Sequence, residues 1–233
     1  MLNPFSIIII NKKQETTMPM QLRIYVPPHP LVAHWLTVAR DKNTPVPLFR
    51  SAMHEIGRWL TYEAMREWLP VQEVGIETPL GPSAGKIIDP NALLAIVPIL
   101  RAGLSLLDGC QSLLPTAAIY HLGFVRNEET LESSCYVNRL PEKFAPDTRI
   151  LITEPMLATG GTIMTTLEML VERGAEPGLI RIVNVICAPP ALQKIDRKFP
   201  GIKIYAAAID ETLNEKGWIV PGLGDAGDRT FGT

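Results

Sequence analysis

The stretch Arg149–Thr153 (RILIT) followed by Glu154–Thr162 (EPMLATGGT) decides the fold of this chain. A short, apolar, β-rich run leads into a loop with two adjacent glycines, and an amphipathic segment, Gly161–Arg173, follows directly. Apolar runs of this length are typical of buried strands, whereas the longer periodic segment is typical of a helix. The stretch therefore predicts a strand, a glycine-rich loop and a helix in that order.

The loop has the residues of an anion site. Gly160 and Gly161 let the backbone approach a ligand closely, and the first N–H groups of the helix point at it. Thr159 and Thr162 add hydroxyl donors, and a helix N-terminus favours a phosphate. A tight turn with Thr162 as N-cap would explain the same residues without a ligand. Glu154 favours the phosphate interpretation, because a carboxylate beside such a loop suits the hydroxyls of a phosphorylated sugar.

Similar apolar runs surround this stretch on both sides. Further strands are predicted at Ala92–Leu100, Ala117–Phe124, Arg181–Cys187 and Lys203–Ile209, with helices at Leu104–Leu114 and Pro190–Phe199. Strands that are apolar on both faces and alternate with helices predict an α/β fold with a central parallel sheet flanked by helices. In such sheets, ligands bind beyond the carboxyl ends of the strands.

The amino-terminal part of the chain predicts two helices and a hairpin. One helix opens at His29-Pro30, and a second runs from Leu48 to Leu69, before a proline. Short strands are expected at Val74–Thr78 and Lys86–Asp89, on either side of the turn Pro79–Pro82. The polar run that follows the first residues predicts a flexible extension over residues 1–20. We expect one domain over residues 21–233.

Composition excludes several classes of protein. Of the 233 residues, 46% are hydrophobic and 20% charged, which is enough to bury a core and excludes a disordered chain. Lys and Arg total 22 against 24 Asp and Glu, so the net charge of −2 disfavours a dedicated nucleic-acid binder. The widely spaced Cys110, Cys135 and Cys187 are expected to be free thiols. No apolar run reaches bilayer length and Met1–Asn11 lacks the features of a signal peptide, so a cytoplasmic location is expected.

Three further segments carry candidate site residues. Arg101 ends an apolar run within Pro98–Gly103, where a cation can hold an anionic group, although an unpaired surface arginine would look the same. The string Arg126–Thr130 has the composition of a solvated charged loop. Trp218–Arg229 contains Gly-x-Gly-x-x-Gly, but too few residues follow for a dinucleotide-binding unit. It is expected to be a glycine-rich loop whose main chain is open to a flat ligand.

Four segments together resemble the uracil phosphoribosyltransferases. They are Pro98–Gly109 (PILRAGLSLLDG), Arg126–Glu132 (RNEETLE), Glu154–Thr162 (EPMLATGGT) and Trp218–Thr233 (WIVPGLGDAGDRTFGT). The resemblance implies a type I phosphoribosyltransferase fold with a small hood, formed by the amino- and carboxyl-terminal segments, that carries the base site. It implies the Mg²⁺-assisted reaction of uracil with 5-phospho-α-D-ribose 1-diphosphate, giving UMP and diphosphate. It also implies a homodimer or higher homo-oligomer.

The resemblance also implies roles for individual residues. The donor would be bound by Arg101, Arg126, Glu154, Pro155, Met156, Leu157, Ala158, Thr159, Gly160, Gly161, Thr162 and Asp225. Uracil would be bound by Ile219, Gly224, Asp225 and Ala226. Asp225, Arg101 and Arg126 are the expected catalytic residues, and Mg²⁺ is expected to be held through the donor rather than by protein ligands.

This sequence departs from the family pattern at a few positions. Glu154 stands where Asp is usual, Val125 replaces an aromatic residue, Trp218 replaces Tyr, and Thr162 replaces Ser. The longer Glu154 side chain bears on donor affinity and leaves the reaction class unchanged. Two other functions remain open at this point: a phosphoribosyltransferase for another base, and a regulator that keeps the fold and binds UMP or RNA.

Overall fold

The computed structural model describes residues 7–8, 23–126 and 133–233, and a central sheet runs through it. Its strand order is β1-β2-β12-β11-β9-β5-β7-β8. The mutually parallel strands are β2 (Arg23–Tyr25), β12 (Lys203–Ile209), β11 (Ile180–Cys187), β9 (Arg149–Thr153), β5 (Leu94–Leu100) and β7 (Leu122–Arg126). Antiparallel strands β1 (Ile7–Ile8) and β8 (Ser133–Asn138) form its two edges. The predicted α/β class is confirmed. The extension expected over residues 1–20 lies outside the described residues, apart from β1.

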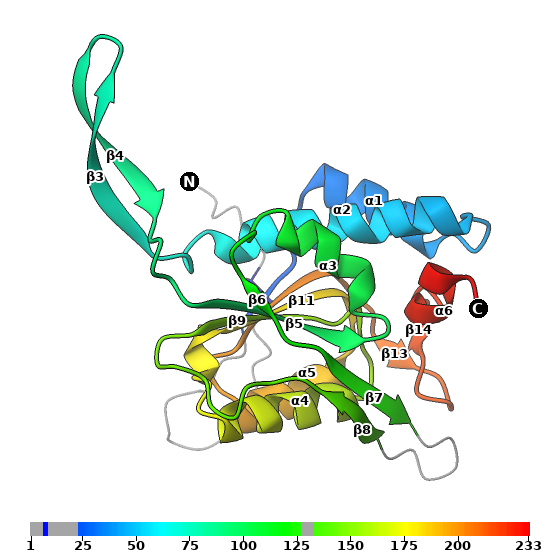
Figure 1. Ribbon diagram of the computed structural model, residues 1–233. Helices are drawn as coiled ribbons and strands as arrows, with labels where there is room; N and C mark the ends of the chain where they lie inside the picture. The colour runs from blue at the N-terminus through cyan, green and yellow to red at the C-terminus, as the bar shows by residue number, and fades with distance from the viewer. Residues whose placement is uncertain (1–6, 9–22, 127–132) are drawn as a thin grey trace.

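Helices cover both faces of the sheet, as Figure 1 shows. On one face lie α1 (Pro30–Arg40), α2 (Val46–Met65) and α3 (Leu104–Gln111), and on the other α4 (Gly161–Glu172) and α5 (Pro189–Lys198). Successive side chains of a strand point to opposite faces. Accordingly, Leu94 and Ile96 of β5 pack into the core under α2 and α3, whereas Ala95 and Val97 pack into the core beside α4 and α5.

Two predicted elements need correction. The run Ala117–Phe124 is two strands, because β6 (Ala118–Ile119) ends before β7 begins. The second helix ends at Met65 rather than Leu69. The physical reason is Trp68, which is buried and donates its indole N–H to the carbonyl of Leu179 at 3.0 Å, so the chain turns inward after Met65.

A two-stranded hairpin projects from the body of the molecule (Figure 1). It consists of β3 (Val71–Thr78) and β4 (Gly81–Ile88), and none of its residues is buried. Thr78 pairs with Gly81, so Pro79 and Leu80 alone form the turn, and the predicted four-residue turn was wrong. Both strands are longer than expected, since the exposed hairpin pairs along its whole length.

The carboxyl-terminal region is a small structure beside the sheet. It contains the antiparallel pair β13 (Thr212–Leu213) and β14 (Ile219–Val220) and the short helix α6 (Ala226–Phe231). Remaining short elements are β10 (Met156–Leu157) and a 3-10 turn at Pro177–Leu179. No helix in the described ranges is long and apolar enough to cross a membrane.

The three cysteines are free, as predicted, and differ in exposure. Cys110 and Cys187 are buried, and burial raises the pKa of each thiol to about 12. Cys135 lies exposed on β8. Cys110 and Cys187 are therefore neutral thiols at neutral pH and contribute to core packing.

Candidate active site

The loop between β9 and α4 starts at the carboxyl end of a central strand, as predicted. Its residues Met156 and Leu157 first form β10, which pairs with β11, and the chain then turns into α4. The N-cap of α4 is Gly160, with φ +84°, where a Cβ would lie 2.9 Å from the Cα of Ala191. A residue with a side chain is therefore strained and crowded at this position. The alternative in which Thr162 caps the helix was wrong.

The start of α4 is open to a ligand. Gly160 has no side chain that can accept from the first N–H groups of the helix, so these groups retain their donor capacity. Lys194 of α5 donates to the carbonyl of Thr159 at 2.8 Å and places a cation beside the loop. The arrangement of helix N-terminus, glycines and nearby ammonium group suits an anion such as a phosphate.

Glu154 is the first residue after β9 and is buried. Burial raises the pKa of its carboxyl group to about 8, and the backbone N–H of Met156 opposes this only weakly, at 3.4 Å from Oε1. Asn184 donates to the backbone carbonyl of Glu154 at 2.8 Å. The Glu154 side chain is therefore mostly protonated at pH 7 in the chain without ligands.

Arg101 follows β5, at the same edge of the sheet. Its exposed guanidinium donates to Asp228 at 2.8 Å and lies 5.8 Å from the ring centroid of Phe231. The turn after it is held tightly, because Thr153 donates to the carbonyl of Gly103 at 3.0 Å. A Cβ on Gly103 would lie only 2.3 Å from the carbonyl oxygen of Thr153. The fold thus brings Arg101 to the end of β9 and to the carboxyl-terminal helix.

Arg126 is the last residue of β7, and its backbone pairs with Ser133 of β8. The charged string predicted to be a loop therefore starts inside a strand. Residues 127–132 lie outside the described residues. Sequence reasoning missed β8, because the run Ser133–Asn138 has little apolar alternation.

The carboxyl-terminal segment differs from the predicted loop. It does contain a turn with positive φ at Gly222 (+59°) and Gly224 (+80°), but Ala226–Phe231 is helical. Asp225 is the N-cap of this helix and accepts from the N–H of Asp228 at 2.8 Å. Glycine-rich composition concealed the helix, which is only six residues long.

Part of the main chain in this segment is open. Ile219 and Ala226 are buried, whereas Gly224 and Asp225 are exposed. Within the described residues, no hydrogen bond engages the backbone N–H of Gly224 or of Ala226. Gly227 lies against Ala102, where a Cβ would be 4.0 Å from the methyl carbon. The open main-chain groups therefore lie next to the Arg101 turn.

Sequence reasoning missed three residues that hold this segment. Asp210 follows β12, so the rule that ligand-binding residues come directly after the strands would have found it. Arg40 ends α1 and has no distinguishing local pattern, whereas Arg229 lies in α6, at the end of the segment Trp218–Arg229, but was given no role of its own. Arg40 pairs with Asp210 through two hydrogen bonds of 2.8 and 2.7 Å.

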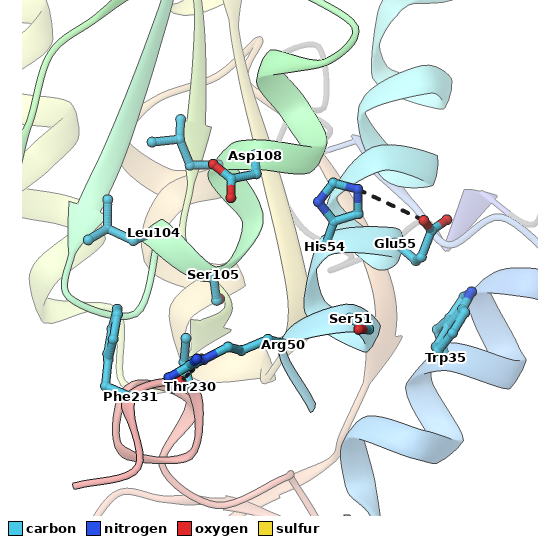
Figure 2. A pocket seen from close by; sticks show the side chains of 11 residues that line it. Trp35, Arg50, Ser51, His54, Glu55, Leu104, Ser105, Asp108, Thr230 and Phe231 are labelled. Carbon is cyan, nitrogen blue, oxygen red and sulfur yellow. Dashed lines mark hydrogen bonds and ion pairs between the residues drawn. The ribbon is translucent and has the colours of Figure 1, made fainter. Parts of the chain in front are cut away.

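A separate cleft of about 600 Å³ lies between α1, α2, α3 and α6 (Figure 2). Its wall includes Arg50, which donates to the carbonyl of Thr230 at 2.6 Å, and His54, whose Nε2 lies 3.9 Å from Glu55. None of its lining residues belongs to Glu154–Thr162 or to Ile219–Ala226. Its lining combines Arg50 with the carboxylates Glu55 and Asp108, so its chemistry favours no single class of ligand.

No group of three or more His, Cys, Asp and Glu that could hold a metal ion is present in the described part of the chain. Two carboxylates lie at the start of α6: Asp228 is bound to Arg101, and Asp225 is exposed as the N-cap. Mg²⁺ prefers oxygen ligands and retains several waters. These carboxylates fit an ion that is held mainly by a phosphorylated ligand.

Comparison with known proteins decides the family. The family model described as "Uracil phosphoribosyltransferase" matches residues 26–233. The chain belongs to the uracil phosphoribosyltransferase family. A uracil phosphoribosyltransferase of Nostoc sp. is 64% identical over 216 residues, which cover 93% of this chain and 100% of the relative. Arabidopsis thaliana has a relative named "Uracil phosphoribosyltransferase, chloroplastic", 52% identical over 213 residues, or 91% of this chain and 72% of the relative.

A solved structure supports the fold of this phosphoribosyltransferase chain. The AQ2163 protein from Aquifex aeolicus superimposes with a TM-score of 0.80 at 39% sequence identity, covering 89% of this chain and 97% of that one. The family suggested by the four sequence segments is therefore confirmed.

Proposed function

We propose that this chain transfers the phosphoribosyl group of 5-phospho-α-D-ribose 1-diphosphate to uracil, giving UMP and diphosphate. Family membership over residues 26–233 supports the reaction. The observation that most directly supports this reaction is that three segments distant in sequence lie together at one edge of the sheet. Arg101 follows β5 and contacts Asp228, and its turn is bonded to Thr153, the residue before the β9–α4 loop.

The β9–α4 loop binds the sugar phosphate in this proposal. Gly160, Gly161 and Thr162, together with Ala158 and Thr159, surround the 5′-phosphate, which the open start of α4 favours. Glu154 lies near the ribose hydroxyls, and the backbone of Pro155, Met156 and Leu157 connects it to the phosphate end. Because Glu154 is mostly protonated at pH 7, its carboxyl group is able to donate as well as accept a hydrogen bond.

Catalysis rests on charge stabilisation. Bond cleavage at the anomeric carbon leaves positive charge on the ribose and negative charge on the departing diphosphate. Arg101 and Arg126 bind the diphosphate, and Asp225 faces the positive ribose. Asp225 and Asp228 lie where they would help to hold a Mg²⁺ ion carried mainly by the donor, and such an ion would supply charge neutralisation of the leaving group. The histidines play no part as nucleophiles or metal ligands in this account.

Base selection depends on the main chain. Uracil presents two carbonyl groups with a ring N–H between them. The unengaged N–H groups of Gly224 and Ala226, together with backbone groups near Ile219, match that pattern. Cytosine reverses the pattern at the ring nitrogen and the exocyclic group, and a wrong hydrogen-bond pattern is rejected by up to ~10⁴-fold.

The remaining parts of the proposal concern the hood, assembly and location. Contacts between α1 and the carboxyl-terminal segment support a hood built from both ends of the domain. The projecting hairpin exposes Val71, Ile76, Leu80, Ile87 and Ile88, which supports a homodimer or higher homo-oligomer. Free, buried cysteines support a reducing compartment such as the cytoplasm.

The test is UMP formation from labelled uracil, the diphosphate donor and Mg²⁺, with cytosine and hypoxanthine in parallel. We expect product with uracil alone, and a dependence on Mg²⁺ that EDTA abolishes. Turnover with another base would keep the phosphate loop and overturn the assignment of Trp218–Arg229. A folded protein that turns over no base would favour the regulator, which a salt-dependent RNA-binding assay then tests.

A further inference from the structure

Both backbone groups of Gly222 are held by one ion pair. Its N–H donates to Oδ2 of Asp210 at 2.8 Å, and its carbonyl accepts from Nη1 of Arg40 at 2.9 Å. Arg40 and Asp210 also bind each other through two hydrogen bonds, at 2.8 and 2.7 Å. The three residues form a closed ring of hydrogen bonds that joins α1, the end of β12 and the carboxyl-terminal segment.

The ring is anchored in the core of the fold. Asp210 is 7% exposed, and its own N–H donates to the carbonyl of Cys187, the last residue of β11, at 2.9 Å. The hydrogen bonds from Arg40 lower the pKa of the Asp210 carboxyl group, so the pair is charged at neutral pH. A bidentate arginine–carboxylate pair fixes direction as well as distance. Gly222 is therefore held at a defined position relative to the sheet.

The same turn has no room to adjust. Gly222 has φ +59°, and a Cβ there would lie 2.3 Å from the carbonyl oxygen of Ile219. Ile219 is itself buried. Any shift of Gly222 is thus transmitted to Ile219 on one side and to Gly224 on the other.

A second arginine holds the next residue. Arg229 donates to the carbonyl of Leu223 at 2.7 Å and to the carbonyl of Asp41 at 2.6 Å, and also to that of Ala39. Its guanidinium lies 4.3 Å from the ring centroid of Phe49. Both backbone groups of Gly222 and the carbonyl of Leu223 are thereby used to hold the turn, while the N–H groups of Gly224 and Ala226 stay unengaged.

We propose that Arg40 and Asp210 are positioning residues that determine base specificity. They contact no substrate, and they act by fixing the register of the main-chain groups that follow Gly222. Because those groups discriminate bases by donor and acceptor pattern, a displacement of the turn weakens uracil binding and relaxes the rejection of cytosine. This inference rests on the proposed function.

The test compares Asp210→Asn and Arg40→Lys with a matched control. Asp210→Asn keeps the side-chain volume and can keep an acceptor for the N–H of Gly222. Its amide NH₂ cannot accept from Arg40, so one of the two hydrogen bonds between these side chains is lost. Arg40→Lys keeps the charge and loses the planar fork that reaches Asp210 and Gly222 together. Glu63→Gln removes another arginine–carboxylate pair, with Arg66 at 3.0 Å, which lies at the carboxyl-terminal end of α2.

We expect the KM for uracil to rise about tenfold or more in both Asp210→Asn and Arg40→Lys, the usual result of losing a charge-assisted hydrogen bond. The KM for the diphosphate donor should stay within about twofold, and the ratio of kcat/KM for uracil over cytosine should fall. The double variant should cost no more than the larger single change, because the two residues act as one unit. Glu63→Gln should leave all of these constants at the wild-type values.

The outcomes separate the two proposals. Wild-type protein that forms no UMP overturns the proposed function and this inference with it. Active wild-type protein, with variants that retain the KM for uracil and the base preference, overturns the positioning role alone. An equal rise in the KM for uracil and in the KM for the donor would show that the ring is merely structural. A lower Tm with unchanged kcat and KM in the folded fraction would show the same. If Asp210→Asn does not fold, Arg40→Lys decides the question.

Discussion

The β9–α4 loop and the segment Trp218–Phe231 are held in place by different means. Residues close in sequence hold the first: β9 leads in, β10 keeps it on the sheet, and Gly160 caps α4. The second is held by distant residues, since Arg40 reaches Gly222 across 182 positions and Arg229 reaches Ala39 across 190. Under the proposed function, the site for a common group, phosphate, is encoded locally, whereas the site that selects the base depends on the complete fold.

The largest effects are expected where the two regions meet. Arg101→Ala and Asp225→Asn should each lower kcat/KM by about 10²–10³-fold, because both act on charge that develops in the reaction. Stability should change little, since the Arg101–Asp228 pair is exposed and Asn is as good an N-cap as Asp. Steady-state kinetics and a thermal melt on the same samples check both parts.

A large loss of Tm in either variant would instead assign that residue a structural role. Glu63→Gln is the matched control, because it removes an arginine–carboxylate pair at the end of α2 that belongs to neither region.

The two regions should also respond to pH in opposite senses. Burial raises the pKa of Glu154 from 4.5 to about 8, so the folded state retains a proton that the unfolded state has lost. The free energy of unfolding should therefore fall by roughly 3 kcal/mol from pH 5 to 7.5, and Glu154→Gln should remove this fall. The pKa of Asp210 is lowered in the folded state, so its ion pair with Arg40 stabilises the fold at neutral pH. This stabilisation is lost as the pH falls below the pKa of Asp210 in the unfolded chain.

Urea unfolding of the wild type, Glu154→Gln and Asp210→Asn, from below pH 3.8 (the ordinary pKa of Asp) up to pH 7.5, measures both slopes. Parallel curves for the wild type and Glu154→Gln would contradict the buried, protonated state of Glu154.

A smaller effect, on stability, is expected from adding one methyl group within Trp218–Phe231. Gly222→Ala should cost at least about 2 kcal/mol of stability, since an L-residue is strained at φ +59° and its Cβ would clash with Ile219. Gly178→Ala is the control, because nothing lies within 4 Å of a Cβ there. Denaturant unfolding compares the two, and equal costs would show that the turn tolerates movement.

The smallest expected effect comes from a variant that tests whether the β9–α4 loop is held only by residues close to it in sequence. Lys194→Met removes the contact from α5 to Thr159, an exposed hydrogen bond. We expect the KM for the donor to rise only about twofold, as for other exposed charges. A much larger rise would mean that this loop, too, depends on distant contacts, or that the lysine binds the phosphate itself.

Sequence patterns predicted the sheet and the conformation of the β9–α4 loop well, because both follow short-range rules. Buried parallel strands are apolar throughout, as in β9 and β11, and adjacent glycines mark the helix start. The division into β6 and β7 was not visible, since β-rich residues occur on both sides of the break.

The segment Trp218–Phe231 was recognised by family resemblance, and the distant residues that hold it were not found at all. Nothing near Arg40 in sequence indicates a role, and the segment Trp218–Arg229 was singled out without a role for Arg229, because both arginines bind carbonyl groups that are remote along the chain. Helix α6 was hidden by composition, since its stability comes from the Asp225 cap and from Arg50 binding Thr230. Such contacts exist only once α1, α2 and the sheet are assembled.

The exposure of Cys135 gives this protein a built-in labelling point. The other two thiols are buried with pKa values near 12, so a maleimide dye should react selectively on β8. β8 pairs with β7, which ends at Arg126, so the fluorophore would report on that end of the molecule. Titrating the labelled protein with diphosphate and then with uracil would reveal, by fluorescence, whether ligands at the two regions influence a common strand pair.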